Sequence, residues 1–211
     1  MARVLLLAAS GLARETLASI ESTGDHEVAG VLDDNARLHG NMMGSVRVLG
    51  GLELARGRTE QLLLCAGQGR HRAAIAGRLA LDDSRYATHA HASAFLGAGT
   101  RLAPGCIVLA GCVATADVSI GRHSVLMPHA MLTHDDRLGD YATLAAGATL
   151  AGSVQLGDRV YIGSNATVRE NLSLGADAVL GMGSALLHDI PAGETWAGSP
   201  ARKLYGSRAA G

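Results

Sequence analysis

The feature that most constrains the fold is a six-residue repeat that continues through residues 95–190. Counted in steps of six from Leu96, fifteen of the sixteen positions are Leu, Ile or Val, and the exception is Ala114. The position four residues further on is Ser, Thr, Ala, Val or Cys in thirteen of the sixteen repeats. Neither a helix nor a simple strand has this period, and a fixed short repeat is typical of a parallel β-helix. We therefore predict that each repeat forms one short face, with the large aliphatic side chain inside and the small residue near the corner.

Composition agrees with a narrow, layered core and excludes some functions. Aromatic residues make up only 3% of the 211 residues, as expected if stacked Leu, Val and Ala fill the prism, because large rings do not fit such layers. The net charge is −1 and no basic run is present, so we expect no nucleic-acid partner. The apolar stretch at the N-terminus is short and ends at a glycine turn, which predicts neither a signal peptide nor a membrane span.

The three cysteines are Cys65, Cys106 and Cys112. Since the set is odd and no export signal is recognised, we expect reduced thiols in a cytoplasmic protein. Cys106 and Cys112 occupy the small inward position of the repeat, so we interpret them as core residues.

Residues 1–85 lack the repeat and instead alternate strand patterns with helical segments. The predicted strands cover residues 3–8, 27–32, 46–49 and 61–66, and the predicted helices cover residues 14–22, 52–56 and 71–81. Such alternation favours a small parallel α/β sheet with Rossmann-like winding. We therefore divide the chain into an N-terminal domain, residues 1–85, and a β-helix domain, residues 86–211.

Ligands of such sheets bind beyond the carboxyl ends of the strands. Three short segments follow those ends and are expected to surround one crevice: Ser10-Gly11, Asp33-Asp34 and Gly67-Gln68. The first loop keeps one of the three glycines of a dinucleotide fingerprint, and the acidic pair follows about twenty residues later. The segments fit a nucleotide site, and they also fit an ordinary strand–turn–helix corner with a solvated Asp pair.

The repeat also predicts which residues of different coils are neighbours. Three faces of six residues make a coil of eighteen, so residues eighteen apart should stack about 4.8 Å apart. In that frame His134 faces outward beside Asp135, and Gly152 lies directly above it. An imidazole oriented by a carboxylate can act as a general base, and the Gly152 N–H could polarise an acyl carbonyl. The alternative is a solvated surface histidine.

Asp136 is the one acidic residue at an inward position of the repeat. A charged group in the interior of the prism is costly unless it is paired. We therefore expect Asp136 either to mark a bulge beside the predicted site or to share the work of Asp135.

Several segments resemble one branch of the left-handed β-helix acyltransferases, the bacterial sugar O- and N-acetyltransferases of the sialic acid O-acetyltransferase type. That branch includes the UDP-4-amino-sugar and GDP-perosamine N-acetyltransferases. The resemblance covers nearly the whole chain, and it is carried by Ser10-Gly11, residues 31–34 (VLDD), residues 66–68 (AGQ) with Arg72, residues 89–94 (HAHASA), His134-Asp135, residues 150–152 (LAG), residues 181–191 and residues 198–202 (GSPAR).

The resemblance implies a homotrimer that transfers acetyl directly from acetyl-CoA to an amine or hydroxyl of a nucleotide-linked sugar, without a metal. His134 would be the general base, Asp135 its partner, and the Gly152 N–H would hold the thioester oxygen. CoA would lie in the groove between adjacent β-helices, and its further candidate contacts are Gly163, Gly181, Gly183, Ser184, Pro200 and Arg202. The nucleotide sugar would contact Ser10, Gly11, Asp33, Asp34, Gly67, Gln68 and Arg72.

The chain departs from that branch at three positions. Leu12 replaces a frequent His after the opening Ser-Gly, and Thr143 replaces a second His nine residues after the base. Asp136 stands where Cys is frequent. These departures leave the sugar, and the choice between N- and O-transfer, open.

Two other functions remain open on the residues. Gamma-class carbonic anhydrases share the β-helix and bind zinc through three His, two of them five residues apart, as His129 and His134 are. The third ligand would be expected near Ser93, and His91 lies off that column. The other alternative is a non-catalytic trimeric β-helix scaffold with a regulatory nucleotide domain.

Overall fold

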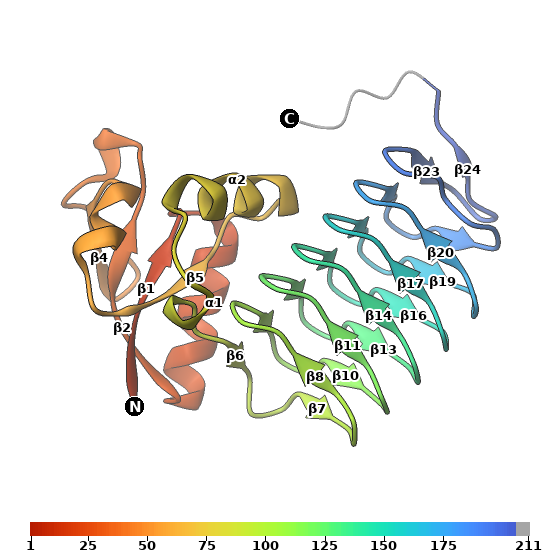
Figure 1. Ribbon diagram of the computed structural model, residues 1–211, viewed down its shortest axis with the longest axis horizontal. Coiled ribbons are helices and arrows are strands. Elements are labelled where there is room, and N and C mark those ends of the chain that lie inside the picture. The colour runs from red at the N-terminus through yellow and green to blue at the C-terminus, as the bar shows by residue number, and fades with distance from the viewer. Residues whose placement is uncertain (206–211) are drawn as a thin grey trace.

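The structure is a computed structural model in which residues 1–205 are described. A small α/β part at the N-terminus packs against the side of a long stack of parallel β coils, which continues to the C-terminal end (Figure 1). In the described part of the chain, no helix has the length and apolar character that crossing a membrane requires.

The N-terminal part is built on a five-stranded sheet in the order β3-β4-β2-β1-β5. Its strands are β1 (Ala2–Leu7), β2 (His26–Leu32), β3 (Met42–Met43), β4 (Val46–Gly50) and β5 (Gln61–Leu64). Neighbouring strands are parallel except β3, which pairs antiparallel with β4. The four predicted strands are present. The prediction missed β3, because a two-residue strand leaves no periodic pattern.

Two α-helices, α1 (Gly11–Thr23) and α2 (Gly69–Leu79), accompany the sheet. Three 3-10 helices lie in the connections: η1 (Ala36–Leu38), η2 (Leu52–Gly57) and η3 (Asp83–Arg85). The helix predicted over residues 52–56 is therefore a 3-10 helix. The prediction began α1 at residue 14, whereas the helix begins at Gly11, because the Ser10 hydroxyl caps it by accepting a hydrogen bond from the Ala13 N–H at 3.3 Å.

One apolar cluster fixes α1 between the sheet and the coils. Its members include side chains from the helix, from the sheet and from the coils: Leu12, Leu17, Leu6, Leu63, Ile107 and Val125. Apolar burial of this kind is the main favourable contribution to packing. The N-terminal part is therefore held against one face of the coils.

The repeat region forms three sheets whose short strands follow one another in turn along the chain, and all pairs are parallel except β23 with the last strand, β24. The six-stranded sheet contains β7 (Phe95–Leu96), β10 (Val113–Ala114), β13 (Met131–Leu132), β16 (Thr149–Leu150), β19 (Thr167–Val168) and β22 (Ala185–Leu186). The five-stranded sheet contains β8 (Arg101–Leu102), β11 (Ser119–Ile120), β14 (Arg137–Leu138), β17 (Gln155–Leu156) and β20 (Ser173–Leu174). The eight-stranded sheet contains β6 (His89–Ala90), β9 (Ile107–Val108), β12 (Val125–Leu126), β15 (Thr143–Leu144), β18 (Tyr161–Ile162), β21 (Val179–Leu180), β23 (Thr195–Ala197) and β24 (Arg202–Lys203).

Residues eighteen apart are partners in these sheets. Met131 pairs with Thr149 and Leu132 pairs with Leu150, and the same spacing holds in the other coils up to β21, which pairs with β23 at a spacing of sixteen. The parallel β-helix and its eighteen-residue coil are therefore confirmed. The left-handed sense of the coil and the Rossmann-like winding of the first sheet stay predictions.

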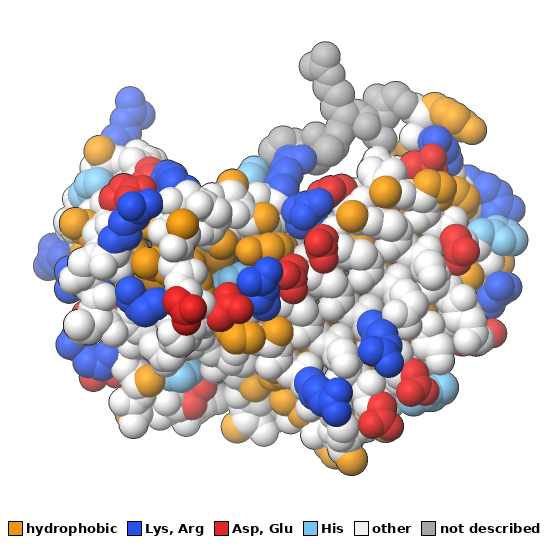
Figure 2. All heavy atoms as spheres, in the orientation of Figure 1, with side chains coloured by type: hydrophobic (Ala, Val, Ile, Leu, Met, Phe, Trp, Pro, Cys, Tyr) orange, Lys and Arg blue, Asp and Glu red, His pale blue; other side chains and the backbone are white. Residues whose placement is uncertain are grey.

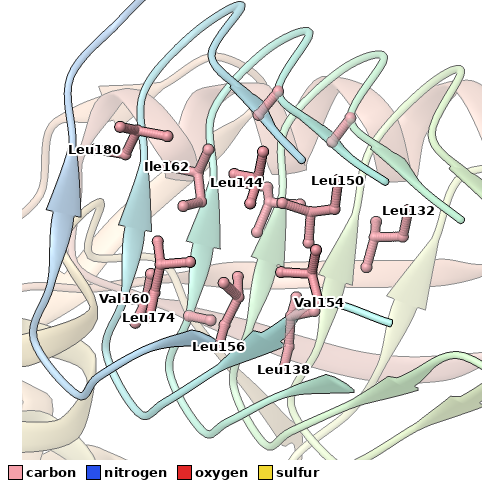
Figure 3. Close-up of a cluster of buried hydrophobic side chains, with 14 of the residues drawn as sticks. Leu132, Leu138, Leu144, Leu150, Val154, Leu156, Val160, Ile162, Leu174 and Leu180 are labelled. Carbon is pink, nitrogen blue, oxygen red and sulfur yellow. The ribbon is translucent and has the colours of Figure 1, made fainter. Parts of the chain in front are cut away.

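The large aliphatic side chains of the repeat fill the prism, where they stack coil on coil (Figure 3). Leu96 is 36% exposed, because β7 is the end strand of its sheet and its coil has no neighbour on one side. The small inward residues from Cys106 onward are buried as predicted, whereas Thr100 in the first coil is half-buried. Burial raises the thiol pKa to about 12 at Cys106 and about 11 at Cys112, so neither is a ready thiolate nucleophile.

A single buried guanidinium joins the two parts of the chain. Arg72 of α2 is 0% exposed, and its donors lie 2.8 to 3.1 Å from six neutral acceptors. The N-terminal part supplies two of them, the carbonyls of Ala66 and Gly67. The coils supply the other four, which are the carbonyls of His123, Tyr141 and Ala142 and the Thr143 hydroxyl. Burial lowers the pKa of Arg72 to about 10.

Candidate active site

His134 lies at the corner between the six-stranded and five-stranded sheets, in the turn that joins β13 to β14. Its Nδ1 is 2.8 Å from Oδ2 of Asp135, and the two side chains are 65% and 59% exposed. Asp135 has a φ of 63°, which is the left-handed conformation that turns the chain at this corner. The structure thus brings the two predicted side chains together at an accessible edge.

Gly152 lies in the next coil, directly beside the imidazole. A Cβ added at Gly152 would lie 2.3 Å from Nε2 of His134, which is closer than real Cβ contacts permit. The Ser153 N–H also donates to the His134 carbonyl at 2.8 Å, so the two coils are in register here. The φ of Gly152 is not in the left-handed region, so glycine is required here by the imidazole and not by the turn.

Asp136 lies inside the prism and forms no bulge. The strands before and after it keep the regular register, so the bulge expectation is wrong. Asp136 is 0% exposed, and its two oxygens accept hydrogen bonds from the Thr133 N–H at 2.9 Å and the Val154 N–H at 2.8 Å. Burial raises the pKa of Asp136 to about 6, against the opposing effect of these two hydrogen bonds.

A cleft of about 860 Å³ lies between the N-terminal end of α2 and the eight-stranded sheet. Gly67 and Gln68 line it from the N-terminal part, and Thr143 and Tyr161 line it from the coils. Its charged lining residues are Arg70, Arg159 and Asp177, and the last two form an ion pair at 2.8 Å. Figure 2 shows acidic and basic side chains gathered where the N-terminal part meets the coils.

The residues predicted at the three strand ends separate into two groups. Gly67 and Gln68 line the cleft, as expected for a ligand site. The side chains of Ser10, Asp33 and Asp34 brace the strand ends instead: the Ser10 hydroxyl donates to the Cys65 carbonyl, and Asp33 accepts from the Ala9 N–H at 2.7 Å.

Asp34 accepts from Arg78 at 2.7 Å, and this hydrogen bond holds the pKa of the Asp34 carboxyl below its ordinary value. Gly11 is the first residue of α1, and the neighbouring Leu12 lines the cleft. Ligand contacts by Ser10, Gly11, Asp33 and Asp34 stay predictions.

The predicted substrate contact at Arg72 is wrong. Its side chain is fully buried, and its guanidinium is engaged by the six acceptors that join the two parts of the chain. A donor group that is saturated and out of contact with solvent cannot also reach a ligand in the cleft. Arg72 acts as a structural joint that fixes the cleft wall at Gly67, whose carbonyl it binds.

Most of the predicted CoA-binding residues gather at the C-terminal end of the coils. Gly163 and Gly181 stack in neighbouring coils, since a Cβ at Gly163 would lie 2.7 Å from the carbonyl carbon of Gly181. Gly183 has a φ of 64° and turns the next corner, and the buried Ser184 accepts from the Gly198 N–H at 3.0 Å.

Pro200 and Arg202 are exposed in the terminal hairpin. Gly152 stands apart from all of these, at the corner beside His134. Their contacts with CoA stay predictions.

Sequence reasoning missed the cleft-lining residues Arg70, Arg159 and Tyr161. Outward residues of a β-helix look alike in sequence, because nothing local shows which face another part of the chain will cover. One signal was present in the columns. The outward column of the eight-stranded sheet reads Ile107, Val125, Thr143, Tyr161 and Val179, whereas that of the five-stranded sheet reads Arg101, Ser119, Arg137, Gln155 and Ser173. The first is apolar enough to predict a covered face.

The zinc alternative gains no support from the geometry. His129 and His134 lie at different corners, at opposite ends of β13. Among residues 1–205, the group of His, Cys, Asp or Glu whose ligand atoms come within 4.8 Å of one another is Asp25, His26 and His89. Hydrogen bonds account for His89, whose ring nitrogens lie 2.8 Å from Asp25 and 2.7 Å from the Ser19 hydroxyl.

Comparison with known proteins agrees with the coiled architecture. The model of the hexapeptide repeat of succinyl-transferase matches residues 153–187. A search of curated protein sequences found no match.

Solved structures match over almost the full length. PerB from Caulobacter crescentus, in complex with CoA and GDP-perosamine, is 27% identical with a TM-score of 0.86, and the match covers 97% of this chain and 98% of that one. A histidine-to-alanine mutant of GDP-perosamine N-acetyltransferase from the same organism, with the same two ligands, is 26% identical with a TM-score of 0.88 and the same coverage. The acetyltransferase domain of PglB from Neisseria gonorrhoeae, in complex with acetyl coenzyme A, is 24% identical with a TM-score of 0.84 over 96% of this chain and 98% of that one.

Proposed function

We propose, from its similarity over nearly the whole chain to hexapeptide-repeat sugar acetyltransferases, that this protein transfers acetyl from acetyl-CoA to a nucleotide-linked sugar. The observation that carries the proposal is the His134–Asp135 pair, held at an accessible corner beside a glycine that leaves room for the reacting groups. Within this proposal, residues 1–85 form a Rossmann-like nucleotide-sugar domain. Residues 86–205 form a left-handed β-helix, and the remainder of the predicted domain 86–211 lies outside the described residues.

The chemistry proposed for this corner is direct transfer. Nε2 of His134 takes the proton from the sugar amine or hydroxyl as that group attacks the thioester carbonyl. Asp135, bonded to Nδ1, keeps the ring oriented and stabilises the imidazolium that forms. The negative charge that develops on the carbonyl oxygen is held by the Gly152 N–H. The carbon–sulfur bond then breaks, and CoA leaves as a thiol after the proton is returned to it.

The cleft is the proposed site for the nucleotide of the sugar substrate. It is open to the N-terminal end of the 11-residue helix α2, where main-chain N–H groups and the helix dipole favour an anion. Arg70 and Arg159 line the same cleft and add positive charge suited to a diphosphate. The likeness to the GDP-perosamine complexes supports this placement.

A second copy of the chain is proposed to complete the site. Each coil is a triangle, and the corner of His134 is the one opposite the eight-stranded sheet, which forms the floor of the cleft. A sugar held in the cleft of one chain therefore meets His134 of another. Exposed apolar residues on the six-stranded sheet, Phe95 at 60% and Met131 at 40%, suit such an interface. A homotrimer with CoA between neighbouring β-helices satisfies these demands, and its mass should be three times 21.6 kDa.

The experiment that tests the function is a panel of nucleotide sugars. UDP-, GDP- and dTDP-linked amino sugars, and their hydroxyl analogues, are each mixed with acetyl-CoA, and release of free CoA is measured with a thiol reagent. The same ligands are tested for a rise in Tm, because a ligand that binds only the folded state stabilises it. We expect turnover with at least one nucleotide sugar and none with acetyl-CoA alone. Stabilisation by nucleotide sugars and by CoA without any acetyl transfer would favour the scaffold alternative.

Gly152→Ala should lower kcat by about 100-fold or more. The added methyl group would occupy the position 2.3 Å from Nε2, so the imidazole must rotate away from the reacting groups. Steady-state kinetics with the substrate identified by the panel measure the effect. Gly77→Ala on the exposed side of α2 is the matched control, since a Cβ there meets nothing within 4 Å. Equal kcat for both variants would show that the imidazole does not act where the structure places it.

A further inference from the structure

Asp136 alters the hydrogen bonding of the coil that carries His134. In the coils on either side, the N–H of the residue that follows the strand donates across to the next coil: Thr115 to the Leu132 carbonyl at 3.1 Å, and Ala151 to the Val168 carbonyl at 3.0 Å. The equivalent N–H of Thr133 donates instead to the Asp136 carboxylate at 2.9 Å. The main chain immediately before His134 is therefore set by a side chain and not by the neighbouring strand.

The second oxygen of Asp136 reaches into the coil of Gly152. It accepts from the Val154 N–H at 2.8 Å, two residues beyond Gly152. The Asp136 carboxylate thus links Thr133, the residue before His134, to the coil of Gly152. In the neighbouring coils the same inward position holds Val118 and Val154, which are fully buried and make no such link.

Asp136 also differs from Asp135 in its surroundings. Asp135 is 59% exposed, so water and salt screen its charge, whereas Asp136 is fully buried directly behind the corner. Charges separated from solvent interact more strongly at the same distance. After the larger effects of burial and of the two main-chain hydrogen bonds, His134 lowers the pKa of the Asp136 carboxyl and Asp135 raises it.

We infer that Asp136 is a positioning residue: it fixes the turn that presents His134 and supplies a buried negative charge that stabilises the imidazolium. This rests on the proposed function of His134 as the base. The other titratable groups at this corner are Asp117 one coil below, Glu170 two coils above, and Arg137 on β14. All three are on the solvent side, so Asp136 is the charge that faces the corner from inside.

The retention of an acid here has a cost that can be measured. The pKa of Asp136 is raised to about 6 in the folded chain. Below about pH 4 the carboxyl is protonated in both the folded and the unfolded chain, so its charge does not affect stability. Above about pH 6 the carboxyl is ionised in both states, and the whole cost of burying its charge lowers the free energy of unfolding. Asp136→Val restores the residue type of the adjacent coils. Its Tm should therefore rise by about 3–6 °C at pH 7.5 and not rise at pH 4. A residue kept only as a brace would give a lower Tm at both pH values.

The basicity of His134 can be followed without any substrate. Diethyl pyrocarbonate modifies neutral imidazole, and mass spectrometry of the intact protein's peptides gives the rate at His134 as a function of pH. In Asp136→Asn and Asp136→Val, which remove the buried charge, diethyl pyrocarbonate should modify His134 faster than in the wild type just above about pH 6, where Asp136 is ionised. His188, exposed in the same column three coils away, is the internal reference and should not change.

Ser124→Ala is the matched variant. Ser124 is another buried inward polar residue that bonds the main chain of adjacent coils, accepting from the Ala142 N–H and donating to the Gly139 carbonyl at 3.1 Å each, but at a different corner. It should leave the His134 profile unchanged. If both Asp136 variants also leave it unchanged, the inference is wrong. If the profile changes but His134→Ala retains full acetyl transfer, the effect of Asp136 on His134 is supported, and the proposal that His134 is the general base is wrong.

Discussion

Replacement of His134 by Ala should lower kcat for acetyl transfer by about 10³-fold, within the range of 10² to 10⁴ that a general base contributes. The loss is expected because no other imidazole lies at this corner within residues 1–205. Stability should change little, since the side chain is 65% exposed. Steady-state kinetics with acetyl-CoA and the sugar selected by the panel measure the effect.

Two variants sharpen this prediction. His188→Ala removes an exposed histidine from the same column and should leave kcat within about twofold of the wild type. Asp135→Asn keeps the shape of the partner but removes its charge, so it should lower kcat less than His134→Ala does. If His134→Ala were as active as His188→Ala, the assignment of the base would be wrong.

Replacement of Arg72 by Met should lower the free energy of unfolding by about 3 kcal/mol or more. The substitution keeps much of the side-chain volume but removes every donor, leaving the carbonyl oxygens of both parts of the chain without their partner in a buried site. Urea unfolding measures the change. The cleft should also be less well ordered, because the Gly67 carbonyl loses its hydrogen bond. The rise in Tm on binding the nucleotide sugar should therefore be smaller in this variant than in the wild type.

The control for Arg72 is Arg78→Met on the same helix. Arg78 is 44% exposed and pairs with Asp34 at 2.7 Å, and surface ion pairs contribute no more than about 1 kcal/mol. Arg72→Lys adds a second comparison: it keeps a positive charge but offers fewer donors, and should fall between wild type and Arg72→Met. Equal unfolding free energies for Arg72→Met and Arg78→Met would show that the joint is unimportant.

The β-helix was predictable because its constraint repeats. Every six-residue segment must supply a large inward aliphatic residue, so one exception such as Ala114 does not hide the period. The stacking of His134 beside Gly152 followed from the same arithmetic. The strands of the first sheet were predictable for a different reason, since each is a short apolar run between turn residues.

The failures share one cause, which is that they depend on contacts between distant segments. The resemblance implied a ligand contact at Arg72, and the sequence does not show the carbonyl oxygens that surround its guanidinium. Asp136 looked like a bulge because its two N–H partners are main-chain groups, which every residue has. The cleft was missed because the outer face of the eight-stranded sheet becomes a cleft wall only where the N-terminal part packs beside it.

The six-residue period also sets an angle, and this restricts how the chain can change in length. Each repeat turns the chain through one third of a coil, so an insertion of six residues before His134 would satisfy every local packing rule and yet carry the imidazole to another corner. An insertion of eighteen residues would return the imidazole to the same corner, but one coil further along the stack and therefore displaced relative to helix α1. Length variation should therefore be restricted before the coil of His134, and also in the later coils that supply Tyr161 and Asp177 to the cleft, because an insertion of six residues would move these side chains to another face.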